Sequence, residues 1–266
     1  MSGVSAGRGV WKGGEFGGQA WCVLAPNASV MTLDGTNTWV LREPGAPRSV
    51  VVDPGPLDEA HLDRVAERAG RVAVVLLTHG HADHSESARS FAERMGCGVR
   101  ALDPRFVYGD QGLHHGDVVE VDGVELHILG TPGHTSDSLS FVLPAERAVL
   151  TGDTVLGRGT SVVAHPDGAL GAYLGSLRRL RDLAEAQGID TIWPGHGPVL
   201  DQASSVLDYY LRHRGERLDQ VRAAVEGGAA DPAAVVQEVY ADVDPQLWPA
   251  AELSVRAQLE YLASHR

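Results

Sequence analysis

The stretch from Leu76 to Ser85 reads LLTHGHADHS and places three histidines and one aspartate within six consecutive positions. The apolar run that leads into it, Val72–Leu77, is rich in β-branched residues, which predicts a buried strand. The polar cluster then falls in the loop at the carboxyl end of that strand, where α/β sheets present reactive groups. Three crowded imidazoles and a carboxylate are costly to desolvate unless a cation holds them together. The stretch therefore predicts an α/β fold with a metal site at a sheet edge.

The spacing inside this loop indicates ligands for two metal ions. His79 and His81 occupy alternate positions and can converge on one ion from a short loop. Asp83 and His84 follow where a helix is expected to begin, so their side chains reach a neighbouring point. One loop is therefore expected to supply ligands to two adjacent ions.

Three further motifs place a ligand-type residue beside glycine at the end of an expected strand. They are GTPGHTSDS with His134, LTGDT with Asp153 and WPGHGP with His196. Glycine lets the backbone approach closely and accepts the positive φ angles that tight metal loops require. The histidines outside such a setting are expected to be packed or solvated, namely His61, His114, His115, His127, His213 and His265.

The composition excludes several broad classes of protein. A chain of 266 residues with 43% hydrophobic residues can bury a sizeable core, which excludes disordered and fibrous proteins. The formal charge of -13 opposes non-specific binding to nucleic acid or anionic membranes. Cys22 and Cys97 do not form the pattern of a disulfide framework or a thiolate zinc site, and no apolar run is long enough to span a bilayer. We expect a cytoplasmic protein, and the single lysine, Lys12, among many arginines indicates a GC-rich bacterial genome.

Strand and helix patterns alternate up to Pro198. Strand-like runs occur at 49–52, 72–78, 118–121, 124–129, 139–143, 148–150 and 191–193. Helical periodicity occurs at 58–69, 85–95 and 172–187. The pair Asp122-Gly123 between two of the runs is the signature of a type I′ hairpin turn. These patterns predict sheets with helices outside them.

The expected organisation has three parts. Residues 1–19 are glycine-rich and are expected to form a flexible N-terminal segment, followed by the main α/β domain over residues 20–201. Residues 202–266 show only helical periodicity, interrupted by glycines and prolines, which predicts a C-terminal helical domain packed on the main one. Its first helix, expected over 204–225, has an apolar face that suits packing, with homodimer formation as the alternative.

The motifs THGHADH, PGHT, GDT and PGHGP, in this order and at strand ends, resemble the metallo-β-lactamase superfamily over roughly residues 20 to 200. The resemblance implies an αββα sandwich of two mixed sheets faced by helices, and two Zn²⁺ ions per chain. It makes His79, His81 and His134 the ligands of one ion. It places Asp83, His84 and His196 on the second ion, with Asp153 bridging the two. Asp53, in VVDPG, matches an aspartate that supports the histidine loop through hydrogen bonds.

Departures from this pattern argue against several branches of the superfamily. His81 replaces the glutamate of the di-iron oxygen-reducing branch, and imidazole-rich ligation suits zinc. Asp153 stands where class B1 β-lactamases carry a cysteine, which disfavours antibiotic hydrolysis as the main activity. The interval from Asp153 to His196 leaves no room for the inserted domain of large RNA-processing exonucleases, and GDTVLGRGTSVV lacks the glyoxalase II signature.

The segments TLDGTNTWVL and GDTVLGRGTSV, together with the helical tail, resemble the lactamase-B-like endoribonuclease branch, which has a short winged-helix-like C-terminal segment. Fungal thioesterases that act on carrier-protein-bound polyketides share the same motifs. The resemblance implies a hydroxide between the metals as nucleophile, with Asp83 as the catalytic residue that orients it and accepts its proton. Arg158 and His165, on the loop after Asp153, are candidate contacts to an anionic leaving group, and Asn37 lies near the metal pocket in such relatives.

The expected substrate is a small molecule or a single-stranded nucleic acid, and the bond that is cleaved stays open at this point. Resemblance favours a phosphodiester, but residues 204–266 hold six arginines against ten acidic residues, a net charge of -4 that makes the tail a poor RNA clamp. Ester or thioester hydrolysis tolerates this acidity. The alternative from another class is a metal-binding interaction protein without turnover, which would need closed coordination or missing ligands.

Overall fold

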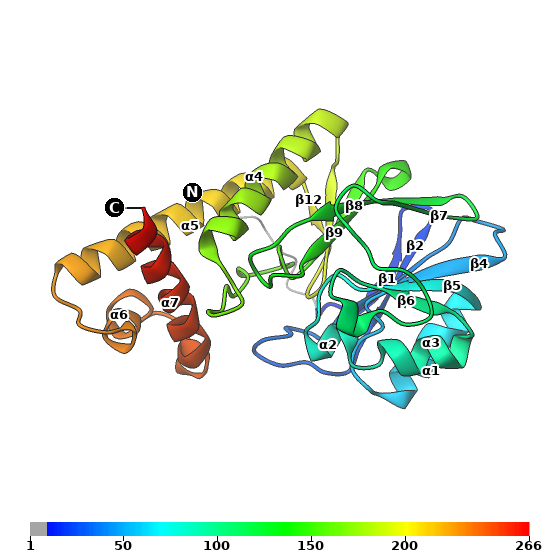
Figure 1. Cartoon of the computed structure of the whole chain (residues 1–266), viewed down its shortest axis with the longest axis horizontal. Helices are drawn as coiled ribbons and strands as arrows, with labels where there is room; N and C mark the ends of the chain where they lie inside the picture. Colours follow the sequence, from blue (N-terminus) through cyan, green and yellow to red (C-terminus); the bar gives the residue numbers. More distant parts are fainter. Residues whose placement is uncertain (1–9, 266) are drawn as a thin grey trace.

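Two mixed six-stranded sheets face each other at the centre of the molecule (Figure 1). The structure is a computed structural model that describes residues 10–265. The first sheet has, in spatial order, β1 (Gly13–Phe16), β2 (Ala20–Leu24), β3 (Asn37–Leu41), β4 (Arg48–Val52), β5 (Arg71–Leu76) and β6 (Gly98–Arg100). The second has β12 (Leu200–Asp201), β11 (Thr191–Pro194), β10 (Ala148–Gly152), β9 (Leu139–Leu143), β8 (Val124–Gly130) and β7 (Val118–Val121).

Helices cover the outer face of each sheet. The first sheet carries α1 (Glu59–Ala69) and α3 (Ala88–Met95), with the short α2 (Ala82–Ser85) before α3. The second sheet carries α4 (Leu170–Gln187) and the first part of α5 (Ala203–Glu226). Three 3₁₀ turns connect elements, η1 (Pro104–Phe106), η2 (Pro144–Glu146) and η3 (Pro245–Leu247). The layers therefore form the αββα sandwich that the motifs implied.

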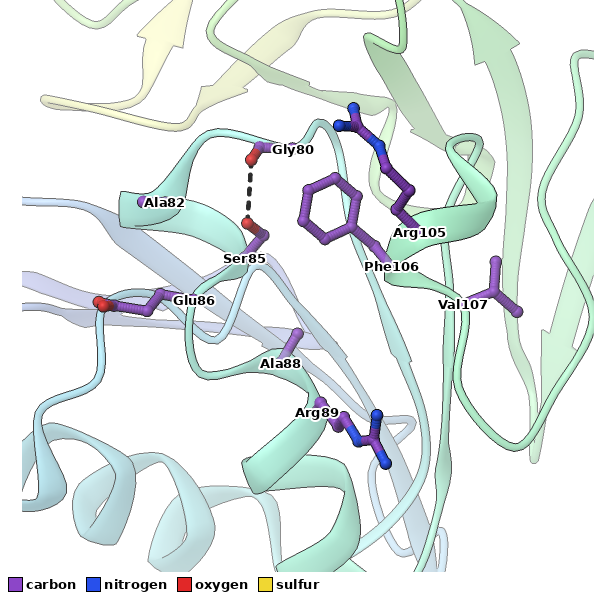
Figure 2. A pocket seen from close by; sticks show the side chains of 9 residues that line it. All are labelled: Gly80, Ala82, Ser85, Glu86, Ala88, Arg89, Arg105, Phe106 and Val107. Atoms are coloured by element: carbon purple, nitrogen blue, oxygen red, sulfur yellow. Dashed lines mark hydrogen bonds between the residues drawn. The ribbon is translucent and has the colours of Figure 1, made fainter.

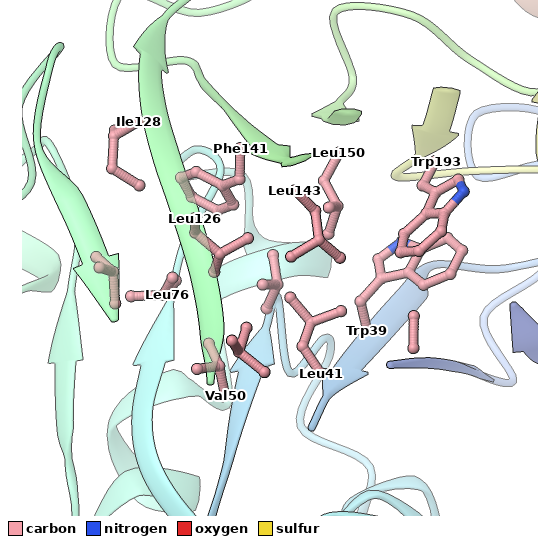
Figure 3. Close-up of a cluster of buried hydrophobic side chains, with 14 of the residues drawn as sticks. Trp39, Leu41, Val50, Leu76, Leu126, Ile128, Phe141, Leu143, Leu150 and Trp193 are labelled. Carbon is pink, nitrogen blue, oxygen red and sulfur yellow. The ribbon is translucent and has the colours of Figure 1, made fainter. Parts of the chain in front are cut away.

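The central core lies between the two sheets because alternate side chains of facing strands point inward (Figure 3). Leu41 and Leu76 of the first sheet oppose Phe141 of the second, and all three are fully buried. At one end of this core the indoles of Trp39 and Trp193 stack with ring centroids 5.0 Å apart. The two sheets are thus fixed relative to each other, and so are the loops at their edges.

Strand β5 positions the histidine-rich loop. It pairs in parallel with β4 on one side and with β6 on the other, and Val74, Val75 and Leu76 are buried. A strand buried on both faces needs the continuous apolar run seen in the sequence. The chain leaves β5 at its carboxyl end with Thr78 and His79, as expected.

The structure confirms the predicted hairpin and corrects two boundaries. Asp122 and Gly123 both have positive φ, 45° and 97°, and join β7 to β8 as a type I′ turn requires. The helix predicted over 85–95 starts later than expected, because α3 begins at Ala88 and Ser85 is the last residue of the separate helix α2. The segment 1–19, predicted to be flexible, contains β1, which pairs with β2, whereas residues 1–9 lie outside the described residues.

The C-terminal region contains α5, α6 (Pro232–Val239) and α7 (Trp248–Ser264), and Figure 1 shows α6 and α7 as a lobe at one end of the sandwich. Within residues 10–265, no strand follows β12, so this part of the winged-helix-like domain is purely helical. The apolar face of α5 is used inside the chain, since Tyr210 packs with α4 and Val221 packs with α6 and α7. Packing, the expected role of this face, is confirmed, and homodimer formation stays a prediction.

Helix α5 also blurs the boundary expected at residue 201. Its first half belongs to the layer that covers the second sheet, and only its second half belongs to the C-terminal lobe. Among the described residues, no helix is long and apolar enough to cross a membrane.

Candidate metal centre

Four chain segments bring the seven predicted ligand residues together at one edge of the sandwich. The loop after β5 and the first turn of α2 supply four of them, the loop between β8 and β9 supplies one, and the ends of β10 and β11 supply one each. In chain order they are His79, His81, Asp83, His84, His134, Asp153 and His196. All of them leave a strand or enter a helix at this edge, which is the reason that distant segments converge.

The first group consists of His79, His81, His134 and Asp153, whose potential ligand atoms lie within 4.8 Å of one another. The Nδ1 atom of His81 lies 3.0 Å from Nε2 of His79 and 3.1 Å from Nε2 of His134. The Oδ2 atom of Asp153 lies 3.7 Å from Nε2 of His134. Three nitrogens and one oxygen thus surround a single point, as the sequence predicted.

The second group consists of Asp83, His84 and His196. The Nε2 atom of His196 lies 3.3 Å from Nε2 of His84 and 3.1 Å from Oδ2 of Asp83. The carboxylate of Asp153 also faces this group, with Oδ1 at 3.4 Å from Nε2 of His84 and Oδ2 at 3.3 Å from Nε2 of His196. Asp153 therefore lies between the two groups, where a bridging ligand has to be.

Hydrogen bonds on the far side of the rings orient the nitrogens that point inward. Nδ1 of His134 donates to the backbone carbonyl of Val162 at 2.7 Å, and Nδ1 of His196 donates to the carbonyl of Gly35 at 3.1 Å. A proton held on Nδ1 leaves the lone pair on Nε2, which is the form that binds a metal.

Asp53 supports the loop in the way expected for it. This buried carboxylate accepts hydrogen bonds from the backbone N–H and the hydroxyl of Thr78, at 2.8 and 2.6 Å. Its Oδ2 also accepts from Nδ1 of His84 at 2.8 Å. Asp53 thereby ties Thr78, at the start of the histidine loop, to the ring of His84 at its end.

The charges of the group are strongly coupled. Burial lowers the pKa of His134 to about 4, and burial together with the charge of His84 lowers the pKa of His79 well below its usual range. Burial also opposes the charged form of His84 and His196, but Asp153 outweighs it and raises the pKa of His196 to about 9 and that of His84 well above its usual range. Burial opposes ionisation of Asp153 as well, yet His196 and His84 hold its pKa well below the usual range. The bridging carboxylate is therefore ionised at neutral pH, the form that binds a cation.

The residues fit a pair of divalent cations. Buried Oδ1 of Asp153 has no hydrogen-bond partner among the described residues. Nδ1 of His81 faces Nε2 of both His79 and His134, and a single proton on it can be donated to only one of these two nitrogens. Such an arrangement is costly unless a positive charge satisfies the lone pairs. Imidazole nitrogens combined with carboxylate oxygens are the ligands of transition-metal sites.

Two glycines allow the backbone to approach the ligands closely. A Cβ atom on Gly195 would lie 2.4 Å from Oδ1 of Asp153 and 2.7 Å from Cε1 of His84. Gly152 has a φ of 49°, and a Cβ there would lie 2.6 Å from the hydroxyl of Thr78. Gly152 and Gly195, which each precede a predicted ligand, therefore let the backbone approach its neighbours closely, as the sequence indicated.

The three residues predicted to contact substrate instead bond to other parts of the protein. Asn37 is fully buried, and its amide donates to the carbonyls of Pro194 and Gly197 while its oxygen accepts from Trp11, so it braces the His196 loop instead of facing substrate. The guanidinium of Arg158 pairs with Asp34. The backbone N–H of His165 donates to the carbonyl of Leu253 in α7, and its ring lies 3.7 Å from Glu260.

Thr36, beside the predicted Asn37, is a neighbour of the second group, and one of the histidines that the sequence set aside is packed elsewhere. The hydroxyl of Thr36 lies 3.4 Å from Oδ2 of Asp83, and the backbone of Thr36 pairs with that of His196. Only its position beside Asn37 in the motif could have drawn attention to it. His61 is packed, as expected, and bonds to Thr38 and Pro54.

A cavity of about 360 Å³ lies against the histidine loop (Figure 2). Gly80 and Ala82, the two residues that flank His81, form one side, and the ring of Phe106 forms another. A Cβ on Gly80 would lie 2.4 Å from this ring, so the glycine lets Phe106 pack directly on the loop. The remaining lining residues are Ser85, Glu86, Ala88, Arg89, Arg105 and Val107.

Comparison with known proteins identifies relatives of the same architecture. Curated relatives include the beta-lactamase-like protein 2 homolog of Drosophila melanogaster, 31% identical over 90% of this chain and 86% of the relative. The atrochrysone carboxyl ACP thioesterase of Aspergillus fumigatus is 32% identical over 82% of this chain and 72% of the relative. Among solved structures, a metallo-beta-lactamase family protein from Thermus thermophilus has a TM-score of 0.78 at 21% identity, covering 93% of this chain and 94% of that one.

Two family models match the chain, one over most of the sandwich and one over the C-terminal helices. Residues 31–196 match the metallo-beta-lactamase superfamily and include all seven predicted ligands. Residues 232–265 match the beta-lactamase associated winged helix domain. The chain therefore belongs to the metallo-β-lactamase superfamily of hydrolases.

Proposed function

We propose that this chain binds two Zn²⁺ ions and hydrolyses an ester or thioester bond of an acyl substrate. The observation that carries the choice of bond is the pairing of the arginines beside the centre. Arg158 pairs with Asp34, and Arg105, on η1 beside the histidine loop, pairs with Asp103. Each cation is thus neutralised by its own carboxylate, which disfavours a phosphate backbone and is compatible with an uncharged acyl group.

The relatives support the same choice. The name of the Aspergillus fumigatus relative, atrochrysone carboxyl ACP thioesterase, describes a thioesterase, and we extend this activity to the present chain only as a proposal. The formal charge of -13 on this chain adds a general repulsion of polyanions.

The two groups of side chains would each hold one ion. His79, His81 and His134 would hold the first ion, and the carboxylate of Asp153 would be shared with the second. A zinc pair bound there would supply a nucleophilic hydroxide at neutral pH and would polarise the carbonyl oxygen of the bond that is cleaved.

Asp83 is suited to orient a nucleophile and accept its proton. Its side chain is 28% exposed, whereas that of His84 beside it is fully buried, so Asp83 faces the opening of the centre. Burial opposes its ionisation, but the hydrogen bond to His196 and the charge of His84 outweigh burial and lower its pKa to about 2. The carboxylate is therefore ionised at neutral pH, the form that can accept a hydrogen bond or a proton from the nucleophile.

The cavity beside Phe106 would receive the non-reacting portion of the substrate. It begins at Gly80 and Ala82, one residue away from His81 on either side, and offers an aromatic wall. Binding energy realised there orients the acyl group over the metals.

Phosphodiester cleavage is the second candidate, since the segments TLDGTNTWVL and GDTVLGRGTSV resemble the endoribonuclease branch. It requires a local basic groove, and the paired state of Arg158 and Arg105 argues against one at the centre.

The test uses the zinc-loaded protein with four substrates, namely an acyl thioester of N-acetylcysteamine, an aryl ester, single-stranded RNA and an activated phosphodiester. Asp83→Ala removes the proposed proton acceptor, and Asp63→Ala is the matched control, because Asp63 is exposed on α1 and pairs with Arg94. We expect thioester or ester turnover that is lost in Asp83→Ala and kept in Asp63→Ala.

Two results would contradict the proposal. RNA cleavage that depends on Asp83, without acyl turnover, would establish the second candidate. Two bound zinc ions without turnover of any substrate would instead favour a metal-binding interaction protein.

A further inference from the structure

Helix α5 contacts the loop that follows the predicted ligand Asp153, although α5 lies outside both regions that match family models, 31–196 and 232–265. This loop, the β10–α4 loop, comprises residues 153–169 and begins with the bridging carboxylate Asp153. Tyr210 and Arg214 of α5 are four residues apart, so they lie one above the other on the same face of the helix. Both are buried, at 2% and 7% exposure.

Tyr210 holds the first half of the β10–α4 loop. Its hydroxyl accepts a hydrogen bond from the backbone N–H of Leu156 at 2.9 Å. The same hydroxyl is within 3.2 Å of the carbonyls of Leu156 and Gly159, to which it can donate. These are backbone contacts, so they fix the path of the loop whatever its side chains are.

Arg214 holds the second half of the loop. Its guanidinium donates to the backbone carbonyl of Ser161 and lies 4.9 Å from the centroid of the Tyr173 ring. Within the described residues, no carboxylate pairs with it, and its Nε has no hydrogen-bond partner. A buried guanidinium without a carboxylate partner costs stability, which argues that its position has another use.

The contact with Ser161 continues directly to a predicted metal ligand. The hydroxyl of Ser161 lies 3.2 Å from Nδ1 of His134, and the carbonyl of the next residue, Val162, accepts the Nδ1 proton at 2.7 Å. This proton must stay on Nδ1 for Nε2 to face the metal position. A shift of Ser161 and Val162 would release the ring and permit the opposite tautomer.

Tyr173 of α4 forms a second link between the metal centre and the region where α4 packs against α5. Its hydroxyl donates to the carbonyl of Thr154 at 2.7 Å, directly after Asp153, while Arg214 lies beside the ring. The loop is therefore attached to α4 at Thr154 and to α5 at Ser161, the residue before Val162.

We propose that Arg214 and Tyr210 are positioning residues through which α5 sets the orientation of His134 and so the affinity of the first metal position. The inference rests on the proposed metal site. It assigns a role in the metal centre to a helix that the sequence alone places in the C-terminal packing region.

The experiment measures how fast a chromogenic chelator removes zinc from the full-length, zinc-loaded protein, resolving the two ions as separate phases. Arg214→Met keeps apolar volume but loses the guanidinium, Arg214→Lys keeps a charge and a donor, and Tyr210→Phe loses only the hydroxyl. Arg212→Met is the matched control, since Arg212 is exposed on the same helix. Unfolding temperatures of the zinc-free proteins are measured in parallel.

We expect Arg214→Met to release one ion roughly tenfold faster, the scale found when partners outside the ligand shell are removed, while the second ion is unaffected. Arg214→Lys should recover part of the loss, Tyr210→Phe should show a smaller change of the same kind, and Arg212→Met should match the wild type. Unchanged release in Arg214→Met and Tyr210→Phe would overturn the inference. Equal acceleration of both ions in proportion to a lower unfolding temperature would also overturn it, because general destabilisation would then suffice. A wild-type protein that binds no zinc contradicts the proposed function instead.

Discussion

Replacing Asp53 by asparagine should weaken metal binding without changing the shape of the side chain. Asp53 has a φ of 51°, and asparagine tolerates the left-handed region as aspartate does, so the backbone gives no separate cause of damage. The carboxylate accepts three hydrogen bonds, one at Oδ1 from the N–H of Thr78 and two at Oδ2 from the Thr78 hydroxyl and from Nδ1 of His84.

An asparagine amide cannot accept all three of these hydrogen bonds. With its oxygen toward the N–H of Thr78, its NH₂ group faces Nδ1 of His84, which must then give up its proton to Nε2. With the amide reversed, the NH₂ group faces the N–H of Thr78 at a distance of 2.8 Å, donor against donor. The first arrangement removes the Nε2 lone pair that faces His196, and the second leaves a buried N–H unpaired.

We therefore expect Asp53→Asn to lower zinc affinity by about 10- to 100-fold, which corresponds to about 1.4 to 2.7 kcal/mol. The assay is a competition titration with a chelator of known affinity, and Asp63→Asn on the surface of α1 is the control. Wild-type affinity in a folded Asp53→Asn protein would refute the argument that Asp53 sets the tautomer of His84.

Three further perturbations test other parts of the site and the fold. Gly195→Ala places a Cβ 2.4 Å from Oδ1 of Asp153 and should lower zinc affinity by roughly tenfold, whereas Gly175→Ala, with open space around it, should leave a zinc titration unchanged. Burial lowers the pKa of His61 to about 4, so the folded protein disfavours protonation of this ring. Its contribution to the free energy of unfolding is therefore complete above the unfolded pKa of about 6.5. This contribution is lost as the pH falls towards 4, by up to about 3 kcal/mol. Urea unfolding at pH 7.5 and pH 4.5 should show a smaller pH effect in His61→Gln than in the wild type, and equal effects would contradict this assignment. Phe106→Ala should raise KM for a substrate with a long non-reacting portion by roughly tenfold with kcat unchanged, and an unchanged KM would remove the cavity from the proposed site.

The predicted metal-ligand residues could be named from the sequence because each one is marked locally. His79 to His84 follow an apolar run whose length and β-branching indicate a buried strand, and His134, Asp153 and His196 each stand beside glycine at a strand end. A ligand loop needs these neighbours for steric reasons that act over a few residues. The αββα layers followed from the resemblance of the same motifs, and the model of the superfamily and the layers of the structure confirm them.

Other features depended on contacts between distant segments and left no local mark. Strand β1 has the sequence GGEF, which carries no alternating pattern, and it forms because β2 pairs with it and Phe16 packs near Trp39 and Trp193. Tertiary pairing here outweighs the low strand propensity of glycine.

The sequence by itself thus determined the family and predicted the metal-ligand residues and their division into two groups, because that information lies in short motifs. Only the tertiary structure decided what surrounds them. It directed the amide of Asn37 to the His196 loop, paired Arg158 with Asp34, and laid the face of α5 that carries Arg214 against the loop that orients His134. These outcomes follow from which surfaces the packed layers bring together, and no short-range pattern encodes that choice.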